Sequence, residues 1–126
     1  MSLQPLQTRA LQIQHLYVQL NEQERGRRWT NEETMLGFVG DVGDLAKLVM
    51  AAEGARTMAG GRAALAHELA DCLWSVLVLA HAYGFDLESE FAKTMGELER
   101  SISARLTEAG RAPSDPSRGS PDGGDR

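Results

Sequence analysis

Hydrophobic residues recur at helical spacing along the first half of the chain. One segment carries five such residues at intervals of three and four, which is the spacing of one helix face: Leu6, Ala10, Ile13, Tyr17 and Leu20. A second segment begins at Thr30, whose spacing from Glu33 matches a capping box, and ends before Gly54. The pattern therefore predicts two helices before residue 54.

The second half shows the same periodicity. A third helix is predicted over residues 62–82, with Gly84 in the position that commonly follows a helix end. Asp86 suits the N-cap of a fourth helix, whose apolar stripe has six members: Leu87, Phe91, Met95, Leu98, Ile102 and Leu106. No segment has a convincing strand pattern, so the sequence predicts an all-α protein whose protomer is a four-helix bundle.

The predicted second and third helices are apolar around much of their circumference. In the second, a broad face is apolar and further leucines, Leu36 and Leu48, lie outside it. A four-helix monomer has too little interior to bury all of this surface. We therefore expect the protomers to assemble into a homodimer or a homotetramer.

The chain's 126 residues suit one domain, which we place at residues 1–110. Residues 111–126 are rich in Gly, Pro, Ser and Asp without apolar periodicity, which predicts a disordered tail. A net charge of −5 argues against binding to nucleic-acid polymers or anionic membranes. No apolar run approaches the length of a membrane span and no signal peptide is evident, so we expect a cytoplasmic protein.

The stretch GFVGDVGDLAKLV carries acidic residues and glycines inside an apolar helix pattern. Its three glycines and two aspartates cost on the order of 4 kcal/mol in helix propensity. Asp41 and Asp44 share one side of this helix, and Glu68 and Asp71 repeat the arrangement on the next helix. In both helices the acidic pair lies among small residues, which leave open volume beside the carboxylates.

Four carboxylates in one groove repel one another unless a cation lies between them. All-oxygen ligation suits Mg²⁺ or Mn²⁺, which also bridge to phosphate oxygens. Lys47, three residues after Asp44, is placed to contact such phosphates. The alternative is that each pair is a solvated helix face, which is the common reading of either pair taken alone. Two pairs on adjacent helices favour the metal site.

The two acidic motifs and their surroundings resemble a known family. The run GDVGDL followed by HELADCL is similar to the E-x-x-E and E-x-x-D motifs of the MazG-like all-α nucleoside triphosphate pyrophosphohydrolases. The flanking WTNEETML and YGFDLESEFAK are also similar, and the resemblance covers about residues 10–100. It implies a Mg²⁺-dependent hydrolase that converts a nucleoside triphosphate and water into the monophosphate and pyrophosphate, with the clearing of unwanted nucleotides as a role that such an activity would suit.

The resemblance also implies roles for individual residues. It places the four metal-binding acids at Asp41, Asp44, Glu68 and Asp71, and the triphosphate-binding lysine at Lys93. We choose Glu68 as the group that accepts the proton of the attacking water, because its longer side chain can reach a second-shell water.

The sequence departs from the family pattern in two places. Aspartate replaces glutamate at 41 and 44, which shortens each arm by one methylene. Glu97 stands where the family's K-x-x-x-N motif has Asn. These departures leave open the alternative function, a non-catalytic helical module that binds metal or nucleotide for regulation or that mediates oligomerisation.

Three further features admit two interpretations each. Trp29, just before the second helix, can stack on a nucleobase or pack as a hydrophobic staple. Arg27 and Arg28 resemble a phosphate clamp, although arginines beside a helix end are commonly solvated. His67 and Asp71 are four residues apart, which fits a metal pair or a hydrogen bond.

Overall fold

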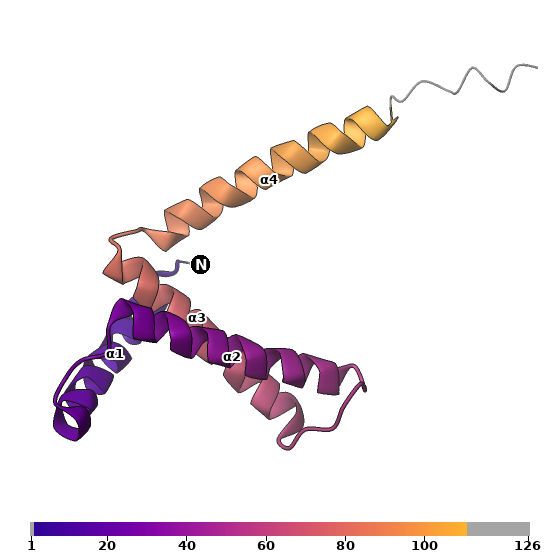
Figure 1. Ribbon diagram of the computed structural model, residues 1–126. Helices are drawn as coiled ribbons and strands as arrows, with labels where there is room; N and C mark the ends of the chain where they lie inside the picture. The colour runs from indigo at the N-terminus through magenta and orange to yellow at the C-terminus, as the bar shows by residue number, and fades with distance from the viewer. Residues whose placement is uncertain (1, 111–126) are drawn as a thin grey trace, which may run out of the picture. The chain divides into compact units, whose positions relative to one another are not determined.

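A computed structural model describes residues 2–110, which form four α-helices and contain no strand. The helices are α1 (Gln4–Arg25), α2 (Asn31–Ala52), α3 (Gly61–Ala82) and α4 (Leu87–Gly110), shown in Figure 1. The all-α prediction is confirmed. The predicted disordered tail, residues 111–126, lies outside the described residues.

The helix ends follow the local signals of the sequence. At the start of α2, the Glu33 backbone N–H donates to Thr30 Oγ1 (3.1 Å) and the Thr30 N–H donates to Glu33 Oε1 (3.2 Å). This is the predicted capping box. Asp86 Oδ1 accepts from the Ser89 N–H (3.2 Å) at the start of α4. Gly84, with φ of 73°, takes the left-handed conformation after α3.

Helix α3 is the central helix of the packed region. It lies side by side with α2 in the opposite direction, joined to it by residues 53–60, and it also packs on α1 (Figure 1). Its indole Trp74 Nε1–H donates to the Ala10 carbonyl (3.1 Å), and the Gln7 amide donates to the Leu77 carbonyl (3.0 Å). The buried residues of α3 are Ser75, Leu77, Val78 and Ala80.

Among the helices of residues 2–110, α3 is long and apolar enough to cross a membrane. We expected no apolar segment to approach the length of a membrane span. By length and composition, that expectation is wrong for α3. Core helices of water-soluble proteins pass the same test, and α3 packs on both α1 and α2. Only 28% of the apolar window of α3 is buried within the described residues, so packing on α1 and α2 accounts for part of its apolar character.

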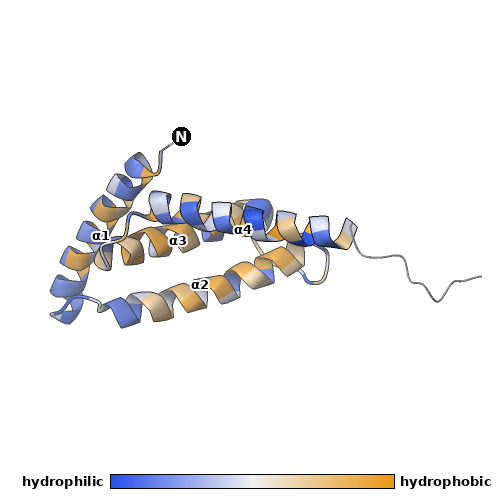
Figure 2. Cartoon of the chain, turned by 90° about the horizontal axis from the view of Figure 1, so that it is seen from above, coloured by the Kyte–Doolittle hydropathy of each residue, from blue (hydrophilic) through white to orange (hydrophobic). Residues whose placement is uncertain are grey.

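Hydrophobic side chains remain exposed along α2 and α3, which Figure 2 shows as largely apolar helices. Only five hydrophobic residues of the described chain are buried: Ala10, Leu48, Leu77, Val78 and Ala80. By contrast, Leu36 is 70% exposed, Val39 56% and Leu69 53%. Helices α2 and α3 therefore present an apolar surface that is not buried in the core of the protomer.

The chain divides into two compact units, one up to Glu90 and one from Phe91 onward. The first contains α1, α2, α3 and the first turn of α4. The described part of the second, residues 91–110, is the remainder of α4 and carries an apolar stripe that a single helix cannot bury by itself: Phe91, Met95, Leu98, Ile102 and Leu106. The arrangement of four helices into one bundle stays a prediction, as does the domain boundary at residue 110.

Candidate metal centre

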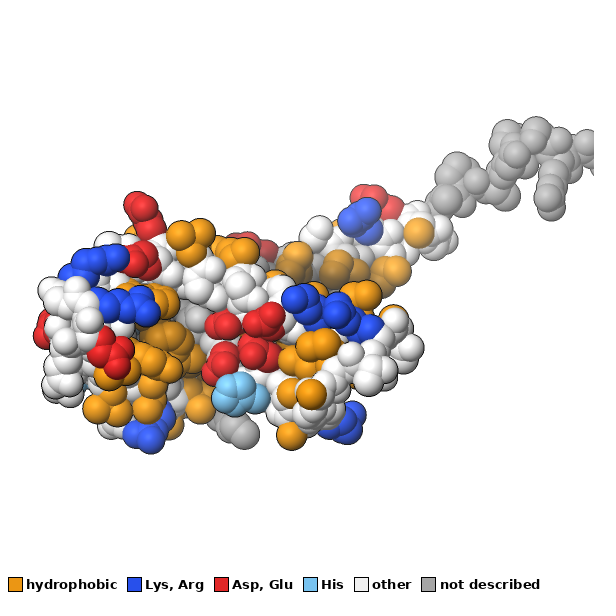
Figure 3. All heavy atoms as spheres, turned by 60° about the horizontal axis from the view of Figure 1, so that its bottom comes forward, with side chains coloured by type: hydrophobic (Ala, Val, Ile, Leu, Met, Phe, Trp, Pro, Cys, Tyr) orange, Lys and Arg blue, Asp and Glu red, His pale blue; other side chains and the backbone are white. Residues whose placement is uncertain are grey.

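Three of the predicted metal-binding acids converge from α2 and α3. Asp41 and Asp44 on α2 and Glu68 on α3 each place a carboxylate oxygen within 4.8 Å of the others. Asp41 and Glu68 are partly buried, whereas Asp44 is exposed. Figure 3 shows acidic side chains gathered on one face of the molecule, with a histidine and a group of basic side chains beside them. Helical periodicity thus brings two separate sequence motifs into one acidic group, defined here as Asp41, Asp44 and Glu68.

The fourth predicted acid, Asp71, is not part of this group. Its Oδ2 lies 3.1 Å from Nε2 of His67, one helical turn earlier on α3. Asp71 is nevertheless close enough for its charge to raise the pKa of Asp41 and of Glu68. The structure therefore places Asp71 at the edge of the acidic group, paired with His67.

Electrostatic repulsion and burial both act on the acidic group. Burial raises the pKa of the Glu68 carboxyl, and the charges of Asp41, Asp71 and Asp44 raise it further. Burial likewise raises the pKa of Asp41, followed by the charges of Asp71 and Asp44. Glu68 Oε2 is buried and has no hydrogen-bond partner among the described residues. A buried carboxylate oxygen without a partner is costly, and a bound cation would offset that cost.

The donor set fits a hard divalent cation. All three side chains offer carboxylate oxygens, the ligands preferred by Mg²⁺ and Mn²⁺. Opposite oxygens of an octahedral Mg²⁺ site lie about 4.2 Å apart, given bonds of about 2.1 Å. The separations here are 4.8 Å or less. Neighbouring oxygens of such a site lie about 3.0 Å apart, so side-chain rotations that bring the carboxylates closer together would close the group around one ion.

Trp29 packs on the start of α2. A Cβ built on Gly37 would lie 3.3 Å from Trp29 Cζ3, so Gly37 makes room for the indole ring. The ring remains 43% exposed, and the Arg25 guanidinium lies 5.9 Å from its centroid. A Cβ built on Gly40 would meet nothing within 4 Å. Of the two glycines before Asp41, one thus accommodates Trp29 and the other borders open space.

The predicted phosphate-binding lysines lie in different units. Lys47 is exposed on α2, three residues after Asp44. Lys93 and Glu97 lie one turn apart on α4, within the second unit. Lys47 therefore belongs to the unit that contains the acidic group, whereas Lys93 belongs to the second unit.

The two arginines before α2 pair with glutamates. Arg27 forms a two-pronged ion pair with Glu33, whose second contact, Nη2 to Oε2, is 3.0 Å. Arg28 Nε lies 3.4 Å from Glu22 Oε1. The two arginines and Glu22 are exposed, whereas Glu33 is partly buried. These contacts support a role for both arginines at the α1–α2 connection.

The contact of Arg25 with Trp29 could not be predicted from the sequence pattern, because it depends on how the chain turns between the helices.

Cys72 is a partly buried thiol that follows Asp71 on α3. Burial raises its pKa, and the charges of Asp41, Glu68 and Asp71 raise it further. A thiol kept neutral is a poor nucleophile. Its environment therefore favours a packing role for Cys72.

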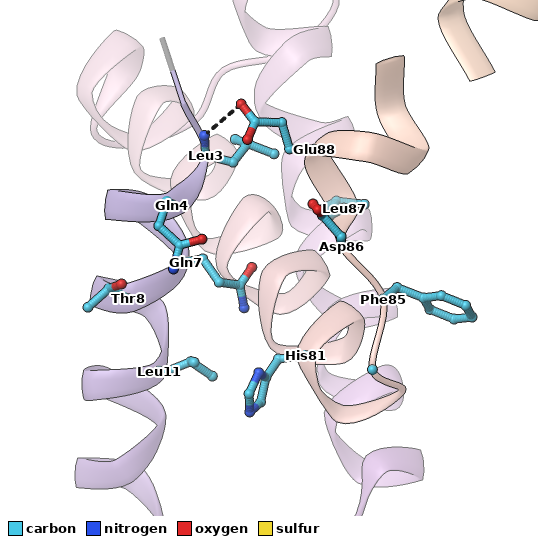
Figure 4. A pocket seen from close by; sticks show the side chains of 11 residues that line it. Leu3, Gln4, Gln7, Thr8, Leu11, His81, Phe85, Asp86, Leu87 and Glu88 are labelled. Atoms are coloured by element: carbon cyan, nitrogen blue, oxygen red, sulfur yellow. Dashed lines mark hydrogen bonds between the residues drawn. The ribbon is translucent and has the colours of Figure 1, made fainter. Parts of the chain in front are cut away.

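A separate cleft of about 500 Å³ lies between the start of α1 and the connection from α3 to α4 (Figure 4). Glu88 Oε1 in this cleft accepts from the Leu3 backbone N–H (3.3 Å), and Asp86 caps α4. Both carboxylates are thus engaged in holding helix ends. The cleft contains no member of the acidic group.

Comparison with known proteins agrees with the geometry of the acidic group. A family model described as the MazG nucleotide pyrophosphohydrolase domain matches residues 29–101, a stretch that contains both acidic pairs. Searches of curated proteins and of solved structures found no match. The matched stretch covers 73 of the 126 residues. The chain therefore belongs to the MazG nucleotide pyrophosphohydrolase family.

Proposed function

We propose that this chain is a Mg²⁺-dependent enzyme that hydrolyses a nucleoside triphosphate to the monophosphate and pyrophosphate. Members of the family are typically Mg²⁺-dependent. One observation carries the proposal: three carboxylates from two helices lie within 4.8 Å of one another inside the matched domain. The buried oxygen of Glu68 without a partner adds to it, since a fold gains nothing from such a group unless a ligand satisfies it.

The acids would hold the metal and the phosphates. Asp41, Asp44, Glu68 and Asp71 are the residues that we assign to Mg²⁺ or Mn²⁺. When bound, the metal offsets the negative charge of the phosphate oxygens. The assignment of Asp71 assumes that its carboxylate reaches the ion from the edge of the acidic group.

Glu68 is our choice for proton transfer. Its pKa is raised by burial and by neighbouring carboxylates, which makes it a stronger base than an ordinary glutamate. We assign it the proton of the attacking water as the anhydride bond between the α- and β-phosphates breaks. One oxygen of Glu68 would contact the cation, and the other would accept this proton.

Lys47, Lys93 and Trp29 are our candidates for substrate binding. Lys47 is exposed within the unit of the acidic group, and Lys93 is assigned by the family motif. Trp29 contacts α2 at Gly37, four residues or about 6 Å of helix before Asp41. A base stacked on the indole would therefore lie about one helical turn from Asp41 along α2 and would share the ring with Arg25.

We further propose that the protein works in the cytoplasm as a homodimer or homotetramer, with no nucleic-acid or membrane partner. The support for self-association is the apolar surface of α2 and α3, where Leu36 and Val39 are more than half exposed. A second copy that covers this surface would supply the burial that one protomer lacks.

The test is pyrophosphate release from a panel of NTPs and dNTPs with Mg²⁺ or Mn²⁺. An Asp71→Asn variant and a sample with EDTA serve as controls. Release that requires both the metal and Asp71 supports the enzyme, and the ranking of nucleotides defines the substrate. Folded protein that binds metal and nucleotide without releasing pyrophosphate supports a regulatory module, which the aspartates at 41 and 44 and Glu97 would then explain.

A further inference from the structure

His67 contacts the predicted metal site, yet the proposed function gives it no role. Its Nε2 lies 3.1 Å from Asp71 Oδ2, and the side chains are 73% and 44% exposed. The imidazole is therefore not a core residue. Its only polar contact among the described residues is with Asp71. An exposed pair of this kind adds little to folding stability. We therefore consider its effect on the predicted metal site.

Helix geometry explains how His67 reaches Asp71. Residues four apart on a helix lie on the same face, one turn above the other. Nε2 of His67 therefore faces Oδ2 of Asp71 at 3.1 Å. The contact engages Oδ2 and leaves the second carboxylate oxygen for another ligand.

The contact also bears on where Asp71 lies. The three members of the acidic group have carboxylate oxygens within 4.8 Å of one another, whereas Asp71 lies outside that limit. Metal-binding side chains are commonly held by hydrogen bonds from neighbouring groups, which fix their orientation and raise metal affinity. His67 is the neighbouring group that contacts Asp71, the one predicted ligand that lies outside the acidic group.

We propose that His67 is a positioning residue that holds Asp71 through Oδ2, so that its other oxygen is oriented for a divalent metal ion. The inference rests on the proposed function, because it assumes that Asp71 contributes to the metal site. It assigns no direct metal bond to His67. His67 thus acts on the ion through Asp71.

The test measures Mn²⁺ binding to the full chain without nucleotide, by the EPR signal of free Mn²⁺. His67→Ala removes the contact with Asp71 Oδ2 and should weaken Mn²⁺ binding about tenfold, the lower end of the range for such neighbouring groups. His67→Gln keeps an N–H donor four residues before Asp71. It should bind Mn²⁺ within about threefold of wild type.

His15 offers a matched control. It lies on α1 in the same spacing, with Nε2 3.4 Å from the Gln19 amide nitrogen, and is exposed like His67. His15→Ala should therefore leave Mn²⁺ binding unchanged. Melting temperatures in EDTA should agree among wild type and all three variants, which shows that affinity changes do not come from unfolding.

Three results would overturn the positioning role. His67→Ala could bind Mn²⁺ as wild type does, or His67→Gln could bind as weakly as His67→Ala. Alternatively, pulsed EPR of bound Mn²⁺ could show a nitrogen coupling that disappears in His67→Gln, which would make His67 a ligand itself. Wild-type protein that binds no Mn²⁺ would overturn the proposed function as well. Wild type that binds Mn²⁺ and releases pyrophosphate, with His67→Ala unchanged, would refute this inference alone.

Discussion

Glu33 at the start of α2 and the acidic group farther along it show carboxylates in opposite environments. Glu33 receives hydrogen bonds from Arg27 and from the Thr30 backbone, and these lower its pKa to about 2. Burial and like charges instead raise the pKa of Asp41 on the same helix. The same forces act on Glu68 on α3. One helix therefore carries a carboxylate that its neighbours stabilise as an anion and another that they do not.

The difference separates Glu33, which stabilises the start of a helix, from the acidic group, which we assign to metal binding. Glu33 completes a capping box and so fixes where α2 begins. Asp41, Asp44 and Glu68 bring their carboxylates within 4.8 Å of one another, and Glu68 Oε2 has no hydrogen-bond partner in the described chain. Their charges oppose folding until a cation binds. The comparison can be tested by neutralising one carboxylate of each kind.

The largest expected effect is on catalysis. Glu68→Gln should lower metal-dependent pyrophosphate release by about 100-fold or more, because it removes a charged ligand and the proposed proton acceptor. Asp41→Asn should lower it by a similar factor. Both variants should melt at a higher temperature than wild type in EDTA at pH 7, since each relieves repulsion within the acidic group.

Glu33→Gln is the matched control for these substitutions. It neutralises an acid of the same helix and should retain activity, while its melting temperature falls because the ion pair with Arg27 is lost. Activity of Glu68→Gln within a few-fold of wild type would remove Glu68 from the mechanism. A lower melting temperature for Asp41→Asn would show that the acidic group stabilises the metal-free fold.

The second prediction concerns pH and metal. Raised pKa values mean that the folded state binds more protons at Asp41 and Glu68 than the unfolded state does, so their contribution to stability falls as pH rises through those values. Glu33 behaves oppositely: its contribution is complete above the ordinary carboxyl pKa of about 4.3 and is lost as pH falls toward 2.

The two contributions can be separated by melting curves of wild type, Glu68→Gln and Glu33→Gln in EDTA. The curves run from pH 3 to pH 8, which is about 1 unit below to 4 units above ordinary carboxyl pKa values. The gain in melting temperature from Glu68→Gln should be largest near neutral pH and vanish in acid, and the loss in melting temperature from Glu33→Gln should also shrink in acid.

Mg²⁺ at about 100 times its Kd should stabilise wild type by about 2.7 kcal/mol. This gain should decrease in acid because protons compete for the carboxylates. A gain independent of pH would argue against carboxylate ligation.

A smaller effect is expected at the helix cap. Thr30→Ala removes the Oγ1 that accepts the Glu33 N–H and should lower the free energy of unfolding by about 1 kcal/mol. Metal binding should be unaffected, since the acidic group lies farther along α2. Urea unfolding and Mn²⁺ titration of the same sample check both points. Weakened Mn²⁺ binding would mean that the start of α2 and the acidic group are coupled.

The sequence predicted the helices well because their ends depend on local chemistry. Thr30 with Glu33 and Asp86 with Ser89 form hydrogen bonds over three residues, and Gly84 takes the conformation that glycine favours. The convergence of the acidic pairs was also predictable, since helical spacing places each pair on one side and a short connection makes α2 and α3 neighbours.

Other features depend on contacts that sequence spacing does not specify. Asp71 has the same spacing from Glu68 as Asp44 has from Asp41, yet it pairs with His67 and lies outside the acidic group. Gly37 was interpreted as open volume beside the carboxylates, but it accommodates Trp29. Both outcomes follow from competition between possible partners, which is decided by side-chain packing after the helices have formed.

The smallest effect tests whether the open space beside the acidic group is used. Gly40→Ala and Gly43→Ala should each stabilise α2 by up to about 1 kcal/mol, because alanine favours the helix and neither Cβ would meet an atom within 4 Å. Gly40 lies closer to the side of α2 that carries the carboxylates, whereas Gly43 lies on the opposite side. Gly40→Ala should therefore raise the KM for nucleotide, and Gly43→Ala should not. Equal kinetics in the two variants would show that substrate does not occupy the space at Gly40, and a destabilised Gly43→Ala protein would indicate that a second copy packs there.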